Sequence, residues 1–321
     1  MSTSNSTSTC FISVDFENYN ITDLPDTVVP VWTTLAIING IASPFTAVLN
    51  ALMVWTILGD HELRSKTYNT LLVSLAVTDL LVGLVVEPLY CQFLVSLTKE
   101  PDPPCLLFEV YMLAMVFCAG MTLCTLMIQS VERYLAIQLP IFHYVHVKTK
   151  RVMTITVATW ICTPTIMLAL RMLLNDSRAF KQVPFIKFIL GNTLVIIYCT
   201  ARVHITAYYK RKTISNAAMS TSQQSQQDRT EQQKQQIKEY KRAFTMGILV
   251  LTSVIFYFPF ITVSIIQAVN GKEVTQDFQY IAKEISATII HLQSLINPFI
   301  ISLRIKKIRK GLKKKMMCRF N

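Results

Sequence analysis

Seven long apolar runs dominate this chain. They lie near residues 30–58, 68–94, 106–138, 150–171, 183–209, 243–269 and 279–301. Each run is long enough to cross a bilayer as a helix, which takes about 20 residues. No run alternates apolar and polar residues with a period of two, so a membrane β-barrel is disfavoured. The pattern predicts an all-α membrane protein whose seven-helix bundle occupies residues 30–301.

The low content of charged residues agrees with several membrane spans. Of the 321 residues, 52% are hydrophobic and 16% are charged, and the mean hydropathy is +0.40. A soluble domain carries about 25% charged residues. Residues 1–29 are polar and lack the basic-then-apolar order of a cleaved signal peptide, so we expect the first run to act as an uncleaved insertion signal.

Basic residues mark one side of the predicted bundle. The loops after runs one, three and five hold Arg64, Lys66, Lys148, Lys150, Arg151, Lys210, Arg211 and Lys212, and nine more Lys and Arg follow in the tail. The opposite loops hold only Lys99, Arg178, Lys181 and Lys272. The positive-inside rule therefore predicts that the N-terminus lies on the outer side of the membrane. Three Asn-x-Ser/Thr sequons, at Asn5, Asn20 and Asn175, fall on the predicted outer side, where glycosylation is expected.

Two polar segments lie on the predicted cytoplasmic side. Residues 213–236 are rich in Ser, Thr and Gln and read as a flexible third cytoplasmic loop. In residues 302–321, apolar positions alternate with basic ones at near-helical spacing. This pattern predicts an amphipathic helix on the inner leaflet, with anionic lipid rather than nucleic acid as its partner. Cys318 follows that helix and is either a palmitoylation site or a free thiol.

Polar residues recur at one depth inside the spans. Asp79 sits in the middle of the second run, and residues at comparable depth on other runs are Asn50, Thr122, Ser294 and Asn297. An ionised carboxylate in the hydrocarbon must face the bundle interior and find partners or a cation. The alternative is a protonated Asp79 in a hydrogen-bond network. The residues alone leave both interpretations open.

Charged residues also meet at one rim of the bundle. The third run ends in Glu132-Arg133-Tyr134, and Glu239 stands twenty residues before Pro259 of the sixth run. Twenty residues of ideal helix span about 30 Å, which places Glu239 level with Arg133. An ion pair between Arg133 and Glu239 would join spans three and six, whereas two separately solvated charges are the alternative.

One characteristic set of residues occurs in nearly every span, in a fixed order. The set comprises Asn50, Leu75-Ala76 with Asp79, Glu132-Arg133-Tyr134, Trp160, Pro259 and Asn297-Pro298. With these residues the chain resembles a rhodopsin-like (class A) G-protein-coupled receptor over roughly residues 30–312. The resemblance implies a receptor, not an enzyme, that binds an extracellular ligand and activates a heterotrimeric G protein. No enzyme motif such as His-Glu-x-x-His or Gly-x-Ser-x-Gly occurs.

The resemblance also implies roles for individual residues. Arg133, with Tyr134 and Tyr198, would meet the G protein, and Glu132 and Glu239 would restrain Arg133 at rest. Asp79 would bind an allosteric sodium ion together with Asn50, Thr122, Ser294 and Asn297. No other cofactor is expected.

Several residues depart from the family pattern. Tyr257 replaces the usual tryptophan of span six, Ser253 replaces a phenylalanine, and Ile301 replaces the tyrosine that ends the span-seven motif. These residues relay activation in the family, so an altered switch is expected. The loop near residues 172–182 has no cysteine, so the usual disulfide cannot form, and Cys105 is left to pair with Cys10 or Cys91.

The residues by which amine receptors and opsins hold their ligands are replaced in this chain, which constrains the class of ligand. Met115 replaces the aspartate that holds the ammonium group in amine receptors, which disfavours a simple amine. His291 replaces the lysine that binds retinal in opsins, which excludes a Schiff base. The residues expected at the ligand are Glu87, Met115, Ala119, Tyr257, Phe260 and His291. The rival interpretations are a receptor-like protein that does not couple and a transporter or channel, the latter disfavoured because the two halves of the chain do not resemble each other.

Overall fold

Seven helices of the computed structural model are long and apolar enough to cross a membrane, counted over the residues that it describes: 25–99, 105–173, 178–218, 226–270, 275 and 278–317. The apolar stretches are Val28–Leu58, Thr67–Lys99, Cys105–Gln138, Thr149–Leu170, Lys187–Tyr209, Phe244–Ile266 and Tyr280–Arg304. Each falls on one predicted run, and no strand occurs in the described parts of the chain. The predicted all-helical seven-span bundle is therefore confirmed.

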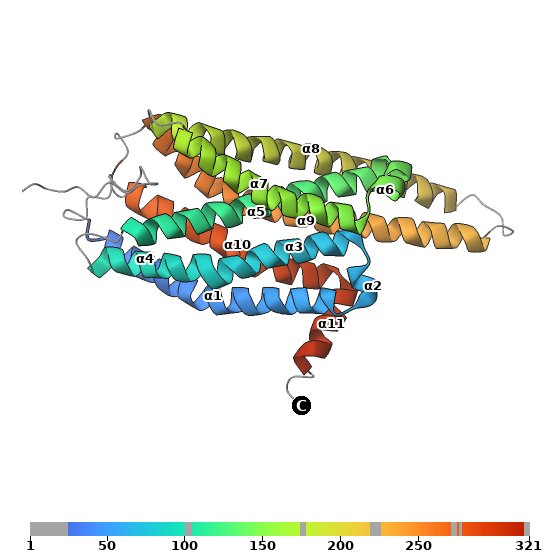
Figure 1. Ribbon diagram of the computed structural model, residues 1–321. Helices are drawn as coiled ribbons and strands as arrows, with labels where there is room; N and C mark the ends of the chain where they lie inside the picture. Colours follow the sequence, from blue (N-terminus) through green and yellow to red (C-terminus); the bar gives the residue numbers. More distant parts are fainter. Residues whose placement is uncertain are drawn as a thin grey trace, which may run out of the picture.

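The spans are built from eight helices, because a π-helical turn divides the second span. They are α1 (Val28–Leu58), α3 (Thr67–Leu81) with α4 (Glu87–Lys99), α5 (Cys105–Gln138), α7 (Thr149–Leu173), α8 (Arg178–Ala218), α9 (Gln226–Asn270) and α10 (Lys283–Arg304) (Figure 1). The π-helical turn η3 (Val82–Val86) joins α3 to α4, and a second one, η6 (Phe278–Ala282), precedes α10. Three short helices, α2 (His61–Arg64), α6 (Pro140–His146) and α11 (Lys306–Met317), lie outside the spans.

Helix α5 lies at the centre of the bundle. It packs against α3, α7 and α8, while α1 packs against α3, α4 and α10, and α9 packs against α8 and α10. Figure 1 shows α11 leaving the bundle at a steep angle to the spans, beside the end of α1. This arrangement brings the polar residues of α1, α3, α5 and α10 into one interior.

Two apolar clusters pack the helices against one another, one cluster at each end of the bundle. One is rich in aromatic side chains from four segments, namely Trp32, Tyr90, Phe93, Phe108, Tyr111 and Tyr280. The other joins α1, α3, α9 and α10 to α11 through Met53, Ile57, Leu72, Met246, Ile301 and Ile308. Ile308 is completely buried, so α11 is anchored to the bundle by its apolar side.

Hydrogen bonds between helices supplement this packing. The indole Nε1 of Trp160 on α7 donates to Thr125 Oγ1 on α5 at 3.0 Å. The amide Nε2 of Gln129 on α5 donates to the carbonyl oxygen of Leu71 on α3 at 2.8 Å. Lipid offers no hydrophobic force between spans, so such polar contacts, each worth about 0.6 kcal/mol, help to fix their positions.

The short helices begin where the sequence provides a start signal. Asp60 accepts a hydrogen bond from the backbone N–H of Leu63 at 3.0 Å and so caps α2. Pro140 occupies the first turn of α6, where its missing N–H is not needed.

The segment predicted as a flexible loop, 213–236, differs in the structure. Helix α8 continues to Ala218 and α9 already begins at Gln226, so only residues 219–225 separate them, and these lie outside the described residues. Gln, Glu, Lys and Ala are good helix formers, which explains why a polar segment can extend two helices beyond the membrane.

Candidate functional site

The buried Glu132–Arg133 pair lies at the end of α5. The guanidinium donates from Nε to Glu132 Oε2 at 2.5 Å and from Nη2 to Oε1 at 2.6 Å. The side chains are only 3% and 6% exposed, respectively. The Tyr68 ring of α3 lies 5.0 Å from the guanidinium carbon, which adds a cation–π contact. Two charge-assisted hydrogen bonds away from water make this a strongly coupled pair.

His143 on α6 contacts the same carboxylate. Its Nε2 lies 3.0 Å from Glu132 Oε1, and its side chain is 25% exposed. The sequence analysis missed this residue, because a contact across eleven positions and a helix break leaves no periodic pattern. Glu132 therefore ties Arg133 to the short helix α6 that follows the third span.

The other residues predicted for G-protein coupling have different surroundings. The rings of Tyr134 on α5 and Tyr198 on α8 pack against each other, with centroids 6.2 Å apart. Tyr198 is 58% exposed. The side chain of Glu239 lies outside the described residues, so the Arg133–Glu239 pair stays a prediction.

A buried polar network surrounds Asp79. Asn297 Nδ2 donates to Asp79 Oδ2 at 2.9 Å, and Ser294 hydrogen-bonds to the same carboxylate. Asn50 Nδ2 in turn donates to the carbonyl oxygen of Ser294 at 3.0 Å. Four of the five residues predicted for the sodium site are thus linked across α1, α3 and α10. The fifth, Thr122, donates instead to Thr78 Oγ1 at 3.3 Å.

Two oxygen atoms of this network lack a hydrogen-bond partner among the described residues, and both are acceptors. They are Asp79 Oδ1 and Asn297 Oδ1, and both are buried. Buried acceptors of this kind require a donor or a cation. Among the described residues no group of three His, Cys, Asp or Glu side chains could hold a metal ion, and Asp79 supplies the one carboxylate of the hydrogen-bonded network described above. Oxygen ligands with one negative charge fit a monovalent cation such as sodium, which would neutralise the carboxylate when bound.

A small cavity adjoins this network, between the second span, α5, α9 and α10. Its volume is about 20 Å³, which is room for about one water molecule. Its lining comprises Val82, Val86, Met115, Cys118, Ala119, Thr122, Tyr257, Ile290, His291, Gln293 and Ser294. Four of the residues predicted at the ligand are among them: Met115, Ala119, Tyr257 and His291. The lining has no carboxylate.

His291 presents a hydrogen-bond acceptor on this lining. Asn39 Nδ2 donates to the Leu35 carbonyl at 2.8 Å and to Thr288 Oγ1 at 3.0 Å, so Asn39 Oδ1 is the atom that lies 3.0 Å from His291 Nδ1. An oxygen acceptor there assigns the proton of the neutral imidazole to Nδ1. Nε2 is therefore an acceptor, and it is buried with no hydrogen-bond partner in the described part of the chain.

The other two predicted ligand residues lie elsewhere. Glu87 is fully buried against α1, where Thr46 Oγ1 donates to its carboxylate at 3.2 Å. Phe260 packs against the aromatic cluster of the bundle. Neither belongs to the cavity lining, so the structure does not bring them to the candidate ligand site.

Ser253, one of the departures from the family pattern, makes a contact between spans six and seven. Gln293 Nε2 donates to Ser253 Oγ at 2.7 Å. A phenylalanine at this position could not accept that bond. Since Gln293 also lines the cavity, this contact connects the cavity to α9.

The cysteines narrow the choice of disulfide. Cys105 is disulfide-bonded, whereas Cys91 is a free thiol that donates to the carbonyl oxygen of Ala36 at 3.3 Å. Cys91 is therefore excluded as the partner of Cys105. The other proposed partner, Cys10, lies outside the described residues, as do Cys318, Asn5, Asn20 and Asn175.

Comparisons with known proteins agree with this architecture. Residues 49–301 match the family model of the 7 transmembrane receptor (rhodopsin family). Squid rhodopsin superposes with a TM-score of 0.77 at 15% identity, covering 97% of this chain and 91% of that one, which supports the fold.

Relatives with sequence similarity carry receptor names. Trace amine-associated receptor 365 of Petromyzon marinus is 24% identical over 297 residues, which cover 83% of this chain and 75% of that protein. The Dopamine D2-like receptor of Drosophila melanogaster is 31% identical over 130 residues, 40% of this chain, which spans only 14% of that relative. The D(1B) dopamine receptor of Mus musculus is 35% identical over 120 residues, 34% of this chain and 24% of that relative. Because the family model covers most of the seven spans, the chain belongs to the rhodopsin-like (class A) family of seven-transmembrane G-protein-coupled receptors.

Proposed function

We propose that this protein is a plasma-membrane receptor that binds an extracellular ligand between its helices and activates a heterotrimeric G protein. The observation that carries the proposal is the buried Glu132–Arg133 pair with its contact to His143. An arginine that is hydrogen-bonded to the neighbouring carboxylate cannot bind a partner protein until those hydrogen bonds break. A ligand activates the receptor if it binds the opened state better than the closed one.

The orientation follows from the distribution of charge. Arg133, the basic helix α11 and the loops rich in Lys and Arg lie at one end of the bundle, which we assign to the cytoplasm. The aromatic cluster and the cavity then lie toward the extracellular end. The N-terminal residues 1–24 would be extracellular.

The ligand class is constrained by the cavity lining. The named relatives are dopamine and trace amine receptors. In this chain Met115 lines the cavity, and no carboxylate stands there to hold an ammonium group. We therefore favour a ligand that is not a simple amine and that offers a hydrogen-bond donor to His291 Nε2. A ligand larger than water must widen the cavity, which would move α5, α9 or α10 relative to one another.

The Asp79 network is the proposed site of allosteric control by sodium. Its two unpartnered oxygens, on Asp79 and Asn297, come from α3 and α10. A cation between them would tie these helices together, and movement of α10 on activation would release it. This role rests on the donor set and on the family to which the chain belongs.

Nucleotide exchange by purified G proteins tests the coupling. Membranes containing wild type, Glu132→Gln or Arg133→Ala are mixed with a panel of heterotrimeric G proteins without ligand. Losing the charge of Glu132 weakens two hydrogen bonds to a charged group, so Glu132→Gln should raise basal exchange about tenfold or more. Arg133→Ala should abolish exchange.

A second candidate function is a receptor-shaped protein that binds partners without coupling. It is favoured by Ile301, which is 1% exposed and fills a core cluster where the family has a tyrosine, and by the Gln293–Ser253 bond. If neither wild type nor Glu132→Gln promotes exchange on any G protein while both fold, this second candidate replaces the first.

A further inference from the structure

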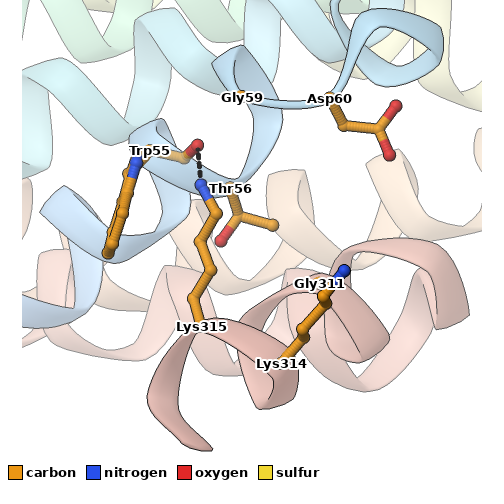
Figure 2. A pocket seen from close by; sticks show the side chains of 7 residues that line it. All are labelled: Trp55, Thr56, Gly59, Asp60, Gly311, Lys314 and Lys315. Carbon is orange, nitrogen blue, oxygen red and sulfur yellow. Dashed lines mark hydrogen bonds between the residues drawn. The ribbon is translucent and has the colours of Figure 1, made fainter. Parts of the chain in front are cut away.

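A groove lies between the last turn of α1 and the basic helix α11. Its volume is about 690 Å³, within the roughly 300–1,000 Å³ of ligand-sized sites. Figure 2 shows Trp55 and Thr56 of α1 on one wall, Lys314 and Lys315 of α11 on the other, and Asp60 at the turn beyond Gly59. The groove shares no lining residue with the cavity of His291, and neither Glu132 nor Arg133 lines it.

Lys315 is held in place at this groove. Its Nζ donates to the carbonyl oxygen of Trp55 at 2.6 Å and lies 4.1 Å from the centre of the Trp55 ring. An ammonium group has three donors, so two remain after this bond. Lys314, the neighbouring residue on α11, is exposed at the same groove. Together they provide two positive charges on one helix.

Thr56 adds a donor that the protein does not use. The residue is 2% exposed, and its hydroxyl has no hydrogen-bond partner within the described residues. Many threonines of the spans donate to the carbonyl four residues earlier, as Thr156 does to Val152 at 2.9 Å. Thr56 lines the groove, and Figure 2 shows its hydroxyl on the side of α11. A buried hydroxyl without a partner indicates a missing ligand group or water.

The charges around the groove select an anion. Helix α11 carries Lys306, Lys307, Arg309, Lys310, Lys313, Lys314 and Lys315 and no acidic residue. The acid at the groove, Asp60, already accepts the hydrogen bond that caps α2. Glu62 nearby pairs with Lys66 and with Lys307. The local balance is therefore strongly positive.

The groove lies where a phospholipid headgroup would be. Trp55 is 53% exposed on the last turn of the first span, which ends at Leu58. Exposed tryptophans at the ends of spans lie at the level of the headgroups. Helix α11 leaves the bundle at this level, beside α1 (Figure 1).

We propose that the groove between α1 and α11 binds the phosphorylated headgroup of an inositol phospholipid. Lys314 and Lys315 bind its phosphate groups, and the Thr56 hydroxyl donates a hydrogen bond to one of them. Clusters of Lys and Arg next to a span attract anionic lipid in general. A groove of this volume with a fixed ammonium group and an unused hydroxyl selects a large, multiply charged headgroup over phosphatidylserine. The assignment of this lipid to the inner leaflet rests on the orientation given under the proposed function. Binding of the headgroup in the groove does not depend on that orientation.

The test measures the Kd of the full-length, detergent-solubilised receptor for a fluorescent short-chain phosphatidylinositol bisphosphate. The groove variant is Lys314→Gln/Lys315→Gln, and the matched control is Lys310→Gln/Lys313→Gln, which removes the same charge from exposed positions of α11 outside the groove. We expect the groove pair to weaken binding about tenfold more than the control pair. Thr56→Val, which keeps the shape and removes the hydroxyl, should weaken binding several-fold.

Competitors identify the source of the phosphate. Unlabelled short-chain phosphatidylinositol bisphosphate should displace the probe at lower concentration than soluble inositol trisphosphate or short-chain phosphatidylserine. Equal losses for the two lysine pairs would mean unspecific attraction and would overturn the site. Equal competition by inositol trisphosphate would assign the groove to a soluble phosphate, and equal competition by phosphatidylserine would remove the headgroup selectivity; either overturns the proposal. Binding is read without a G protein, so its failure is distinguishable from failure of coupling.

Discussion

The imidazole Nε2 of His143 lies 3.0 Å from Glu132 Oε1, the oxygen that also accepts a hydrogen bond from Arg133 Nη2 at 2.6 Å. One carboxylate is thus shared by the arginine at the end of α5 and by the short helix α6. Movement of α6 away from the bundle would weaken the restraint on Arg133. A partner that contacts α6 therefore has a direct route to the Glu132–Arg133 pair.

His143→Phe is expected to raise basal nucleotide exchange. The variant keeps an aromatic ring and removes one hydrogen bond to a charged group, so we expect a rise of about two- to tenfold, smaller than that of Glu132→Gln. The control is His146→Phe on the same helix, because His146 contacts Phe142 and not Glu132. Equal basal exchange in wild type and His143→Phe would show that α6 does not restrain Arg133.

Sodium should stabilise the receptor through Asp79. Asp79→Asn removes the charge that the proposed cation neutralises, so the rise of Tm on replacing choline chloride with sodium chloride should disappear. A ligand that binds only the folded state stabilises it by RT ln(1 + [L]/Kd), which is about 2.7 kcal/mol at a hundredfold excess over Kd. Thr122→Val should keep most of the sodium response, because Thr122 bonds to Thr78 rather than to Asp79. A sodium response that survives in Asp79→Asn would move the site elsewhere.

Gly83 lies at a close approach of the second span to α1. A Cβ at this position would lie 2.7 Å from the backbone nitrogen of Ala47 and 3.1 Å from the carbonyl oxygen of Ser43. Backbone atoms cannot yield as side chains can, so Gly83→Ala should cost about 1–3 kcal/mol and lower Tm. The control is Gly120→Ala on α5, where a Cβ would meet nothing within 4 Å. That variant should be neutral or stabilise by about 0.5–1 kcal/mol. Thermal unfolding of both purified variants decides the matter, and equal Tm values would refute the close packing.

The pairing of Glu62 with Lys307 should make the attachment of α11 depend on pH. The hydrogen bonds from Lys307 and then Lys66 hold the pKa of Glu62 below its usual value. Because the pKa of Glu62 is lower in the folded state than in the unfolded state, the pair stabilises the attachment of α11 fully at pH values above the usual carboxyl pKa of about 4.3. This stabilisation is lost as the pH falls through the lowered pKa. The pair is exposed, so the effect is small.

Hydrogen exchange of α11 measures this effect. Amides of α11 should exchange slightly faster in Glu62→Gln than in wild type at neutral pH, and the difference should vanish at the acid end of the titration. Equal exchange in the two proteins at neutral pH would assign the attachment to the apolar contacts of Ile308, and a difference that persists unchanged at acid pH would mean that it does not come from the charge of Glu62.

Much of the architecture follows from the sequence for simple physical reasons. Seven runs of about 20 or more apolar residues can satisfy their backbone in lipid only as helices, so the spans were predicted with ends within a few residues. The contact between Glu132 and Arg133 was expected only from the resemblance to the receptor family, whereas the residue spacing by itself suggested a pair of Arg133 with Glu239.

Contacts between distant side chains were harder to predict. Thr122 lies at the depth of Asp79, yet its hydroxyl reaches Thr78, the residue before Asp79, because depth does not determine which face of a helix a side chain occupies. The bond between His291 and Asn39 joins residues 252 positions apart and has no sequence signature. The helical extensions to Ala218 and from Gln226 were missed because polar composition alone was taken as a sign of a loop.

The π-helical turn η3 has a consequence for comparing this receptor with its relatives. A π turn holds one residue more than an α turn, so it rotates the residues that follow by about 100° relative to an uninterrupted helix. Glu87 follows Asp79 by eight positions, and with this turn their side chains point within roughly 20° of each other instead of about 80°. Relative to a receptor whose second span lacks the extra residue, every position from Glu87 outward is displaced by one. An ungapped alignment there compares residues on different faces, and substitutions transferred from such a relative to Tyr90 or Phe93 would test the wrong neighbours.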